Sequence, residues 1–511
     1  MNANLLTDAI LTIEDATGVR SKCSLPSLLA ALGARDVNWL SRVQPHQADI
    51  VHIFLCQLAA LALHKAASSS IEQDEAGWRA LLLALTDGDA APWQLVQDDP
   101  SVAAFLQPPM PSKLAAGLKL KAATPDELDV LQTAKNHDLK QARMRTAECE
   151  DWVYALICVQ TSSGFLGQGN YGICRMNGGF ASRVCVSCNS SMNPGVRWAE
   201  DVSRILQRLP ALVVDPWPYV SDGHTLLWRL PWDGASNLLM DELHPCFIEV
   251  CRVVRITSRA GVLRAFGHPA SVARIAARET KGNVGDFWTP VDRSRRVGFT
   301  PPSTGLSATL LRELVVAQEK FEPAPLQQLE GLSGPAWFRA SVLIRGQGTT
   351  EGFHEENIYI GEKAKQTLLA GGAGRERLAR MSQWALERAS DARGKVLRPT
   401  LFVLLDGGDE AAARGGAREA ADWMRAWLES FESGWSSEYF SWLWSSIDLD
   451  DETARDIWLQ MLRARATAAL EHAIKAAPKR SGRRFRALTS ATSMFQQRWN
   501  RYLKEDARHV A

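Results

Sequence analysis

The chain has 511 residues, of which 46% are hydrophobic and 23% are charged. This is the composition of an ordinary globular protein, and the length predicts two or three domains, because one hydrophobic core seldom covers so many residues. The 58 lysines and arginines nearly balance the 57 aspartates and glutamates, which leaves a formal net charge of +1. A strong global field is therefore excluded, and any nucleic-acid binding has to come from local basic patches.

The cysteines and the first residues predict a cellular compartment. The nine cysteines are scattered, and Met1–Asp8 has no basic segment of the kind that opens a secretory signal. We therefore expect a protein of the reducing cytoplasm. The most apolar run, residues 50–63, contains His52 and Gln57 and is too short to span a bilayer. It predicts a core helix, and no membrane partner is expected.

The N-terminal part predicts short elements. Residues 9–13 favour a strand, and Ser24 followed by Pro26 favours the capped start of a helix. Residues 75–85 favour another helix. Residues 124–147 are polar and weakly periodic, so they form either a disordered connection or a loop that contacts a ligand. The centre of that segment holds Lys135, Asn136 and His137.

Residues 164–179 contain six glycines in sixteen positions, a density that excludes a regular helix. The spacing of Gly167, Gly169 and Gly172 matches the dinucleotide-binding fingerprint, but that motif needs a strand before it and a helix after it. Here a strand-like stretch, residues 183–187, follows the glycines. We interpret the segment either as a loop whose backbone amides face phosphates or as a buried structural loop.

Cys185 and Cys188 are spaced like a redox dithiol or half of a zinc site, but a structural zinc needs four ligands. Cys246 and Cys251 flank an apolar strand-like stretch that would point their sulfurs to opposite faces. Buried free thiols are the prediction, and no metal or other cofactor is expected.

Basic residues recur between Arg252 and Lys281, where Glu279 is the single acid, and again at Arg293, Arg295 and Arg296. The first run predicts either a solvated face or a surface that meets phosphates. The second group, Arg293 to Arg296, lies in a turn.

Further on, residues 337–344 and 357–360 favour strands, and the stretch between them holds three glycines within seven residues. This pattern predicts a hairpin with a polar tip at Gln347, although a flexible turn has the same composition.

The C-terminal part changes to helical periodicity after residue 374. Apolar residues mark one helix over 378–396, which Pro399 kinks or ends, and three more over 420–435, 458–473 and 485–502. Four such helices predict a bundle. The fourth carries an expected seam of Phe485, Leu488, Thr492, Phe495, Trp499 and Tyr502.

Charge is uneven along these helices: residues 406–456 are mainly acidic, and residues 457–504 are mainly basic. The two halves can neutralise each other laterally. Five basic residues nevertheless gather at one turn, more than neighbouring helices can pair, so an anionic partner is expected there. They are Lys479, Arg480, Arg483, Arg484 and Arg486.

The sequence has no signature of an enzyme: it lacks the Gly-x-Ser-x-Gly elbow, the His-Glu-x-x-His zinc motif and the Walker lysine. The single cluster of a histidine with carboxylates, His354–Glu356, has no second histidine and is interpreted as local polar structure. No catalytic residue is predicted.

Several stretches, taken in order, resemble one family, the large subunit (CasA) of the type I-E CRISPR surveillance complex Cascade. Their order and the closing helical bundle together cover nearly the whole chain. The stretches are Asn4–Leu6, Ser24–Leu25, Cys56–Leu61, Phe105–Gln107, the glycine-rich segment, His244–Arg252, Gly285–Pro290 and Arg345–Thr350.

The resemblance implies an α+β fold, with a mixed α/β domain over residues 1–366 and a four-helix bundle over residues 367–511. It implies a protein without catalytic activity, whose partners are the other Cascade subunits, the CRISPR guide RNA, the double-stranded DNA target and a helicase-nuclease. Such subunits read the protospacer-adjacent motif from the minor groove and wedge the duplex open so that the guide can pair.

Carried onto this sequence, the resemblance assigns motif recognition and the wedge to four segments. Their residues are Lys135, Asn136 and His137; Gly167, Gln168, Gly169 and Asn170; Arg293, Arg295 and Arg296; and Arg345, Gln347, Gly348 and Thr349. The basic cluster around Arg483 is assigned to the displaced strand or to nuclease docking.

Two departures stand out. Some family members bind a structural zinc through Cys-x-x-Cys pairs, where this chain offers only Cys149. Its glycine-rich segment is also interrupted by Leu166, Gln168 and Asn170. A scaffold subunit without DNA contact and a nucleotide-dependent enzyme are the alternative functions.

Overall fold

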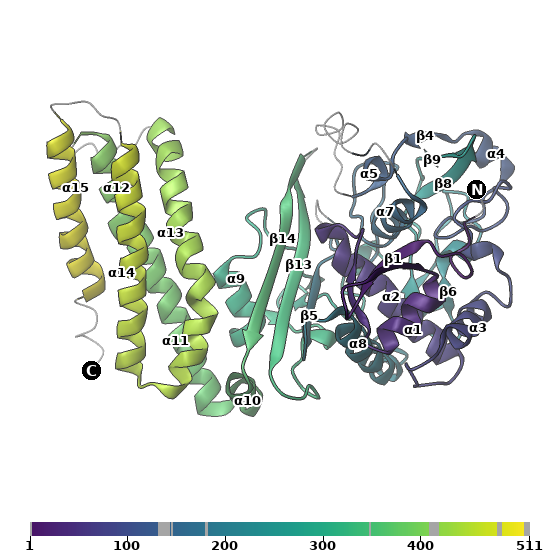
Figure 1. Ribbon diagram of the computed structural model, residues 1–511, viewed down its shortest axis with the longest axis horizontal. Helices are drawn as coiled ribbons and strands as arrows, with labels where there is room; N and C mark the ends of the chain where they lie inside the picture. The colour runs from purple at the N-terminus through teal and green to yellow at the C-terminus, as the bar shows by residue number, and fades with distance from the viewer. Residues whose placement is uncertain are drawn as a thin grey trace. The chain divides into compact units, whose positions relative to one another are not determined.

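A computed structural model describes residues 3–130, 144, 147–178, 182–346, 349–407, 418–477 and 483–504 (Figure 1). The chain forms two compact units. Unit 1 comprises Met1–Leu306 and Gln318–Ile358, and unit 2 comprises Ser307–Ala317 and Tyr359–Ala511. The predicted fold class, mixed helix and sheet followed by a helical C-terminal region, is confirmed. The domain boundary expected after residue 366 falls inside helix α10 (Glu362–Ala370).

Unit 1 combines helices with small sheets. Its helices are α1 (Leu25–Gly33), α2 (Pro45–Lys65), α3 (Glu75–Leu85), α4 (Ser112–Ala116), α5 (Pro125–Leu128), α7 (Cys149–Thr161) and α8 (Pro194–Arg208). Its strands are β1 (Leu11–Asp15), β2 (Arg20–Cys23), β3 (Val37–Leu40), β4 (Lys119–Ala122), β5 (Cys185–Asn189), β6 (His224–Leu226), β7 (Leu243–Ile248), β8 (Val253–Arg259), β9 (Val262–His268), β10 (Val291–Asp292), β11 (Val297–Gly298), β12 (Phe321–Glu322), β13 (Ala336–Gly346) and β14 (Thr349–Ile360). They form sheets in the orders β2-β1-β3, β11-β10-β12, β14-β13-β5 and β4-β9-β8, and a β6-β7 pair.

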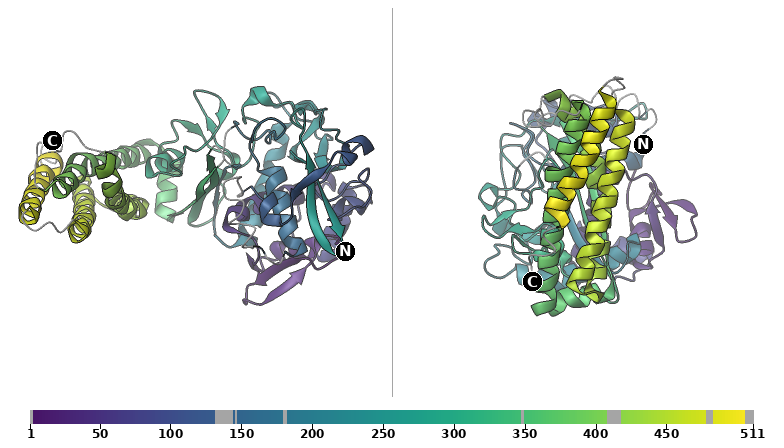
Figure 2. Two further views of the ribbon diagram at one scale, coloured as in Figure 1. Left: turned by 90° about the horizontal axis from the view of Figure 1, so that it is seen from above. Right: turned by 90° about the vertical axis from the view of Figure 1, so that its left-hand side faces the viewer.

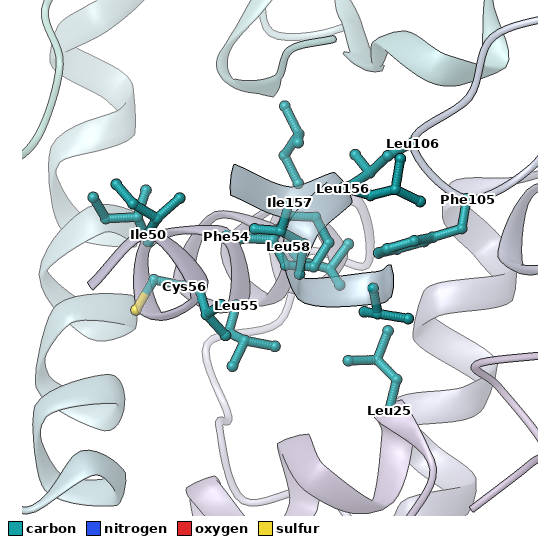
Figure 3. Close-up of a cluster of buried hydrophobic side chains, with 14 of the residues drawn as sticks. Leu25, Ile50, Phe54, Leu55, Cys56, Leu58, Phe105, Leu106, Leu156 and Ile157 are labelled. Carbon is teal, nitrogen blue, oxygen red and sulfur yellow. The ribbon is translucent and has the colours of Figure 1, made fainter. Parts of the chain in front are cut away.

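Helix α2 forms the centre of the core of unit 1. The helix extends beyond the apolar run on both sides, so the expectation that it is too short to cross a membrane was wrong. Because 94% of its most apolar window is buried inside the protein, the predicted core helix is confirmed. Figure 3 shows Phe54 and Leu58 of α2 beside Leu156 and Ile157 of α7. Phe54 also meets Phe105 edge to face, with ring centroids 5.7 Å apart. Burial of side chains of this size stabilises the unit by about 1.5–3 kcal/mol each.

The predicted start of α1 is confirmed. Ser24 lies at the N-cap in an extended conformation, and its hydroxyl accepts a hydrogen bond from the backbone N–H of Ser27 (3.2 Å). Pro26 occupies the first turn, where its missing N–H costs no helical hydrogen bond.

Unit 2 is helical, and the views of Figure 2 show its long helices side by side. They are α9 (Ala308–Arg312), α10, α11 (Gly372–Asp391), α12 (Arg398–Leu405), α13 (Arg418–Ser445), α14 (Asp451–Ala476) and α15 (Arg484–Trp499). A π-helical turn, Ala392–Leu397, connects α11 to α12. Pro399 is therefore accommodated in the first turn of α12.

Aromatic side chains fill the interior of unit 2. Trp458 of α14 is fully buried, and its ring centroid lies 4.5 Å from that of Trp442 and 6.0 Å from that of Trp435. Its indole N–H donates to the carbonyl of Ala385 (3.0 Å), so the polar atom of this large side chain is satisfied.

The predicted seam of α15 is wrong at two positions. Phe485 is 81% exposed and Thr492 is exposed. Because the helix begins at Arg484, Phe485 lies at its end, and the helical period carries the buried stripe through other residues. The buried residues of this helix are Ala487, Ala491, Met494, Phe495 and Trp499.

Candidate nucleic-acid interface

The glycine-rich loop, defined here as residues 164–178, connects α7 to β5 and contains neither helix nor strand. A helix precedes the glycines and a strand follows them, the reverse of the order that a dinucleotide-binding fingerprint requires. The predicted irregular loop is therefore confirmed.

The tip of this loop is a tight turn. The N–H of Leu166 donates to the carbonyl of Asn170 (2.9 Å), and the N–H of Asn170 donates to the carbonyl of Gly167 (3.0 Å). Gly167 and Gly169 have φ angles of +104° and +85°, which glycine adopts without steric cost. A Cβ at residue 169 would lie 2.6 Å from the Cβ of Pro269. The turn thus presents Gln168, which is exposed, on a close-packed backbone.

Two buried arginines fix the loop. Arg252 donates to the carbonyls of Gly164 (2.9 Å) and Tyr171. Arg175, within the loop, donates to Glu249 (3.0 Å) and lies over the ring of Phe247, 3.8 Å from its centroid. Such bonds satisfy the guanidinium groups inside the protein and give the loop a defined path.

The basic run between residues 252 and 281 is therefore not one surface. Arg252, Arg255 and Arg274 are buried, and their guanidinium groups donate to backbone carbonyls. Burial lowers the pKa of Arg255 and of Arg274 to about 10. The remaining basic residues of the run, which are exposed, are Arg259, Arg264, Arg278 and Lys281.

The basic turn, Arg293–Arg296, connects β10 to β11 and is exposed. The Arg295 side chain is 71% exposed and pairs with Asp292 (3.3 Å), and the Arg296 side chain is 61% exposed and pairs with Glu322 (2.9 Å). Arg293 donates to the carbonyl of Gln318 (3.4 Å). The pair of Arg296 with Glu322 is exposed on both sides, and exposed pairs of this kind are weak, so Arg296 can exchange its carboxylate for a phosphate at little cost.

Glycines pack the basic turn close to the glycine-rich loop. A Cβ on Gly282 would lie 2.7 Å from the backbone N of Asn177, and one on Gly298 would lie 2.8 Å from the carbonyl oxygen of Gly282. The N–H of Gly298 donates to the carbonyl of Lys281 (3.0 Å). Two segments more than a hundred residues apart are thereby packed together in unit 1.

The predicted hairpin strands are present as β13 and β14, which are neighbours in one sheet with β5. The N–H of Ser182 donates to the carbonyl of Leu343 (2.8 Å), and the Leu343 N–H donates to the hydroxyl of Ser182 (2.9 Å). Since Ser182 also pairs with Ser163 at the start of the glycine-rich loop, the base of the loop is joined to the part of β13 that leads into the hairpin tip.

Several of the predicted contact residues lie outside the part of the chain that the structure describes, and their roles stay predictions. They are Lys135, Asn136, His137, Gln347, Gly348, Lys479 and Arg480, together with the side chains of Arg345 and Thr349.

A buried carboxylate, which the sequence analysis did not find, anchors the hairpin. Asp49 of α2 pairs with Arg339 of β13 (2.8 Å) and Arg197 of α8 (3.1 Å), and it accepts a short hydrogen bond from Ser341. Arg339 also pairs with Glu355 of β14 (2.9 Å). Burial raises the pKa of Asp49, but the two guanidinium groups outweigh it and hold the pKa below its ordinary value. The signal in the sequence was an acidic residue, Asp49, just before the apolar run of α2, which indicates a carboxylate that has to be paired when it is buried.

One other buried cluster has the donor atoms of a metal site. The side chains of His52, Cys56 and Asp201 offer three ligand atoms within 4.8 Å of one another. His52 Nε2 lies 2.8 Å from Asp201, which also accepts from Asn189 (2.8 Å). All three groups thus have protein partners in the core. The predicted buried thiols are confirmed, since none of the nine cysteines forms a disulfide and seven of them are buried.

In unit 2, Arg483 and Arg484 line a cavity of about 210 Å³ together with Asp406 and Gly407. The Cδ of Arg483 would lie 3.3 Å from a Cβ placed on Gly407. Arg486 is exposed. The described part of the predicted basic cluster is thus half-buried at Arg484 and open to solvent at Arg483 and Arg486.

Comparison with solved structures gives a full-length match. The chain superimposes on Cse1 from Thermobifida fusca with a TM-score of 0.64 at 13% identity, covering 98% of each chain. It matches CRISPR-associated Cse1 from Acidimicrobium ferrooxidans with a TM-score of 0.62 at 14% identity, covering 98% of this chain and 99% of that one. The chain has the Cse1/CasA fold.

A further Cse1/CasA match is CasA from Thermus thermophilus, with a TM-score of 0.61 at 13% identity, covering 99% of this chain and 100% of that one. No family model and no curated protein sequence matches. Because the coverage is nearly complete, the Cse1/CasA fold includes both units, and the predicted resemblance holds at the level of structure.

Proposed function

We propose that this chain is the large, non-catalytic subunit of an RNA-guided complex of the type I-E Cascade kind. In that role it recognises the protospacer-adjacent motif in double-stranded DNA and starts duplex opening for guide-RNA pairing. One solved structure of the same fold is described as a CRISPR RNA-guided surveillance complex; it has a TM-score of 0.57 at 12% identity, covering 97% of this chain and 99% of that one.

The observation that supports the proposal best is the convergence of three segments in unit 1. The glycine-rich loop is packed on the segment that leads to the basic turn, and β13 is bonded close to the hairpin tip to the base of the same loop. The minor groove of DNA is narrow, and its hydrogen-bonding groups distinguish the base pairs only partly. A protein that binds there therefore needs a slim backbone and nearby cations. The tight turn of the glycine-rich loop supplies the slim backbone, and the exposed arginines of the basic turn supply cations.

Reconstitution tests this proposal. The guide-RNA complex is assembled from its cognate partners with and without the chain, and binding of a motif-containing duplex is measured. The proposal requires that the chain join the RNA-containing complex and raise its affinity for duplex DNA. A chain that assembles without any effect on DNA binding is instead a scaffold subunit.

The wedge gives a specific expectation. Replacing Gln347 by alanine should slow strand separation more than it weakens first contact with DNA, because a wedge acts after docking. A fluorescent base placed next to the motif measures the separation. Gln383→Ala, at an exposed position of α11, is the matched control and should behave as wild type. If wild type, Gln347→Ala and Gln383→Ala all open the duplex at the same rate, Gln347 does not act as the wedge.

The basic turn gives a second expectation. Replacing Arg293, Arg295 and Arg296 by alanine should weaken binding to every duplex sequence, because phosphate contacts carry no sequence information. Each lost phosphate contact should lower the slope of log affinity against log salt by about one unit. Arg20→Ala removes an equally exposed arginine from β2 as a control. Identical salt slopes for the triple variant and wild type would show that the turn only faces solvent.

The helicase-nuclease is the remaining proposed partner. Arg483, Arg484 and Arg486, with Lys479 and Arg480, are proposed to guide the displaced strand or to seat this enzyme. The exposure of Arg483 and Arg486 supports that role.

A further inference from the structure

A groove lies between the glycine-rich loop and residues 271–281. Its volume is about 880 Å³, within the range of small-molecule sites. The loop contributes Phe165 and Tyr171, and the facing segment contributes Ile275 and Lys281. The motif-reading role proposed for the turn at Gln168 gives this groove no function.

The loop places apolar side chains where folding does not require them. Phe165 is 42% exposed and Leu166 is 39% exposed. The ring of Phe165 lies 6.0 Å from that of Tyr171, inclined by 44°. The Tyr171 hydroxyl donates to the carbonyl of Ser271 (3.0 Å), which holds the second ring in place. Two adjoining aromatic rings, one fixed and one open to solvent, form a stacking surface at the groove.

The opposite side of the groove is charged and polar. Arg278, Glu279 and Lys281 line it, and all three are exposed. Within the described residues, neither Arg278 nor Lys281 forms an ion pair, so the three side chains leave one net positive charge. Thr280 on this side and Asn177 of the glycine-rich loop add neutral hydrogen-bonding groups. An aromatic surface facing cations and amides is complementary to a nucleotide, which has a flat base, polar base edges and an anionic phosphate.

We propose that this groove binds one unpaired nucleotide of the opened DNA, with its base stacked on Phe165 and its phosphate beside Lys281 and Arg278. A paired base cannot occupy it, since a duplex hides the faces of its bases. The segment bearing Lys281 continues through Gly282 to the packing with the basic turn, so the strand released by opening has a short path to the groove. The inference rests on the proposed function and adds a site that binds a nucleotide of the strand released when the duplex opens.

The test uses the complete complex and two DNAs of one sequence, a fully paired duplex and one with a pre-opened bubble beside the motif. The bubble carries 2-aminopurine at each displaced position in turn, because stacking quenches this base. We expect one position to be quenched. Phe165→Ala should abolish that quenching and weaken bubble binding about tenfold, with a smaller effect on the paired duplex. Phe165→Tyr should restore both, and Val262→Ala, at a 53% exposed position of β9, is the control.

The outcomes are distinguishable. The wild-type complex can discriminate motifs while the Phe165→Ala complex quenches 2-aminopurine and binds the bubble as strongly as wild type. In that case the nucleotide site is wrong and the proposed function stands. If Phe165→Ala instead prevents the chain from joining the complex, the surface binds a protein subunit and the inference is also wrong. If the wild-type complex fails to bind motif-containing duplex, the proposed function fails and the inference fails with it.

Discussion

Replacing Asp49 by alanine is expected to lower the free energy of unfolding of unit 1 by about 3–5 kcal/mol, because the change leaves buried guanidinium groups without their carboxylate. Arg339 retains Glu355, whereas Arg197 forms no other ion pair among the described residues. Chemical denaturation of the full chain measures the loss, and hydrogen exchange of the β13 amides shows where it acts. A faster exchange in β13 would report loosening of the hairpin.

The control is Glu14→Ala, which breaks the surface pair with Arg20 and should change stability by less than about 1 kcal/mol.

The dependence of stability on acid pH supplies an independent check. The pKa of Asp49 in the folded chain lies below the value of about 3.9 expected when unfolded. Its contribution is thus complete above that pH and declines as the pH falls below it. Asp49→Asn should remove this part of the acid sensitivity. A variant as stable and as acid-sensitive as wild type would refute the anchor.

Replacing Trp499 by alanine is expected to cost about 3–5 kcal/mol in unit 2. Trp499 is only 3% exposed and its ring stacks on Phe495 at a centroid distance of 5.9 Å. Phe485→Ala, in the same helix, removes an aromatic ring that is 81% exposed and should change stability by less than about 0.5 kcal/mol.

Denaturation of both variants, followed by near-ultraviolet circular dichroism of the aromatic core, separates the two cases. Similar losses for Phe485→Ala and Trp499→Ala would mean that the helix buries the seam expected from the sequence, contrary to the structure.

That contrast shows what local pattern can predict. The cap at Ser24, the core helix α2 and the irregular glycine-rich loop follow from residue types within a few positions, and each was predicted. The expected orientation of α15 was wrong at Phe485 because two residue series share nearly the same helical spacing, and packing against α12 decides which of them is buried.

Contacts between distant segments were beyond that reasoning. The sequence marks Arg252 and Arg255 only as basic residues, and their burial depends on carbonyl groups of other loops. Asp49 likewise has partners 148 and 290 residues away. The packing of Gly282 on the glycine-rich loop joins two candidate segments that the sequence analysis could relate only through resemblance.

The central claim is that this chain gives an RNA-guided complex its preference for a short duplex motif. The most direct measurement is selection from duplexes with a randomised flank beside a fixed guide-matched target, using the complex with and without the chain. We predict that the complete complex enriches a small set of flanking sequences and that omission of the chain abolishes the enrichment. Equal enrichment without the chain, or none with it, would contradict the account.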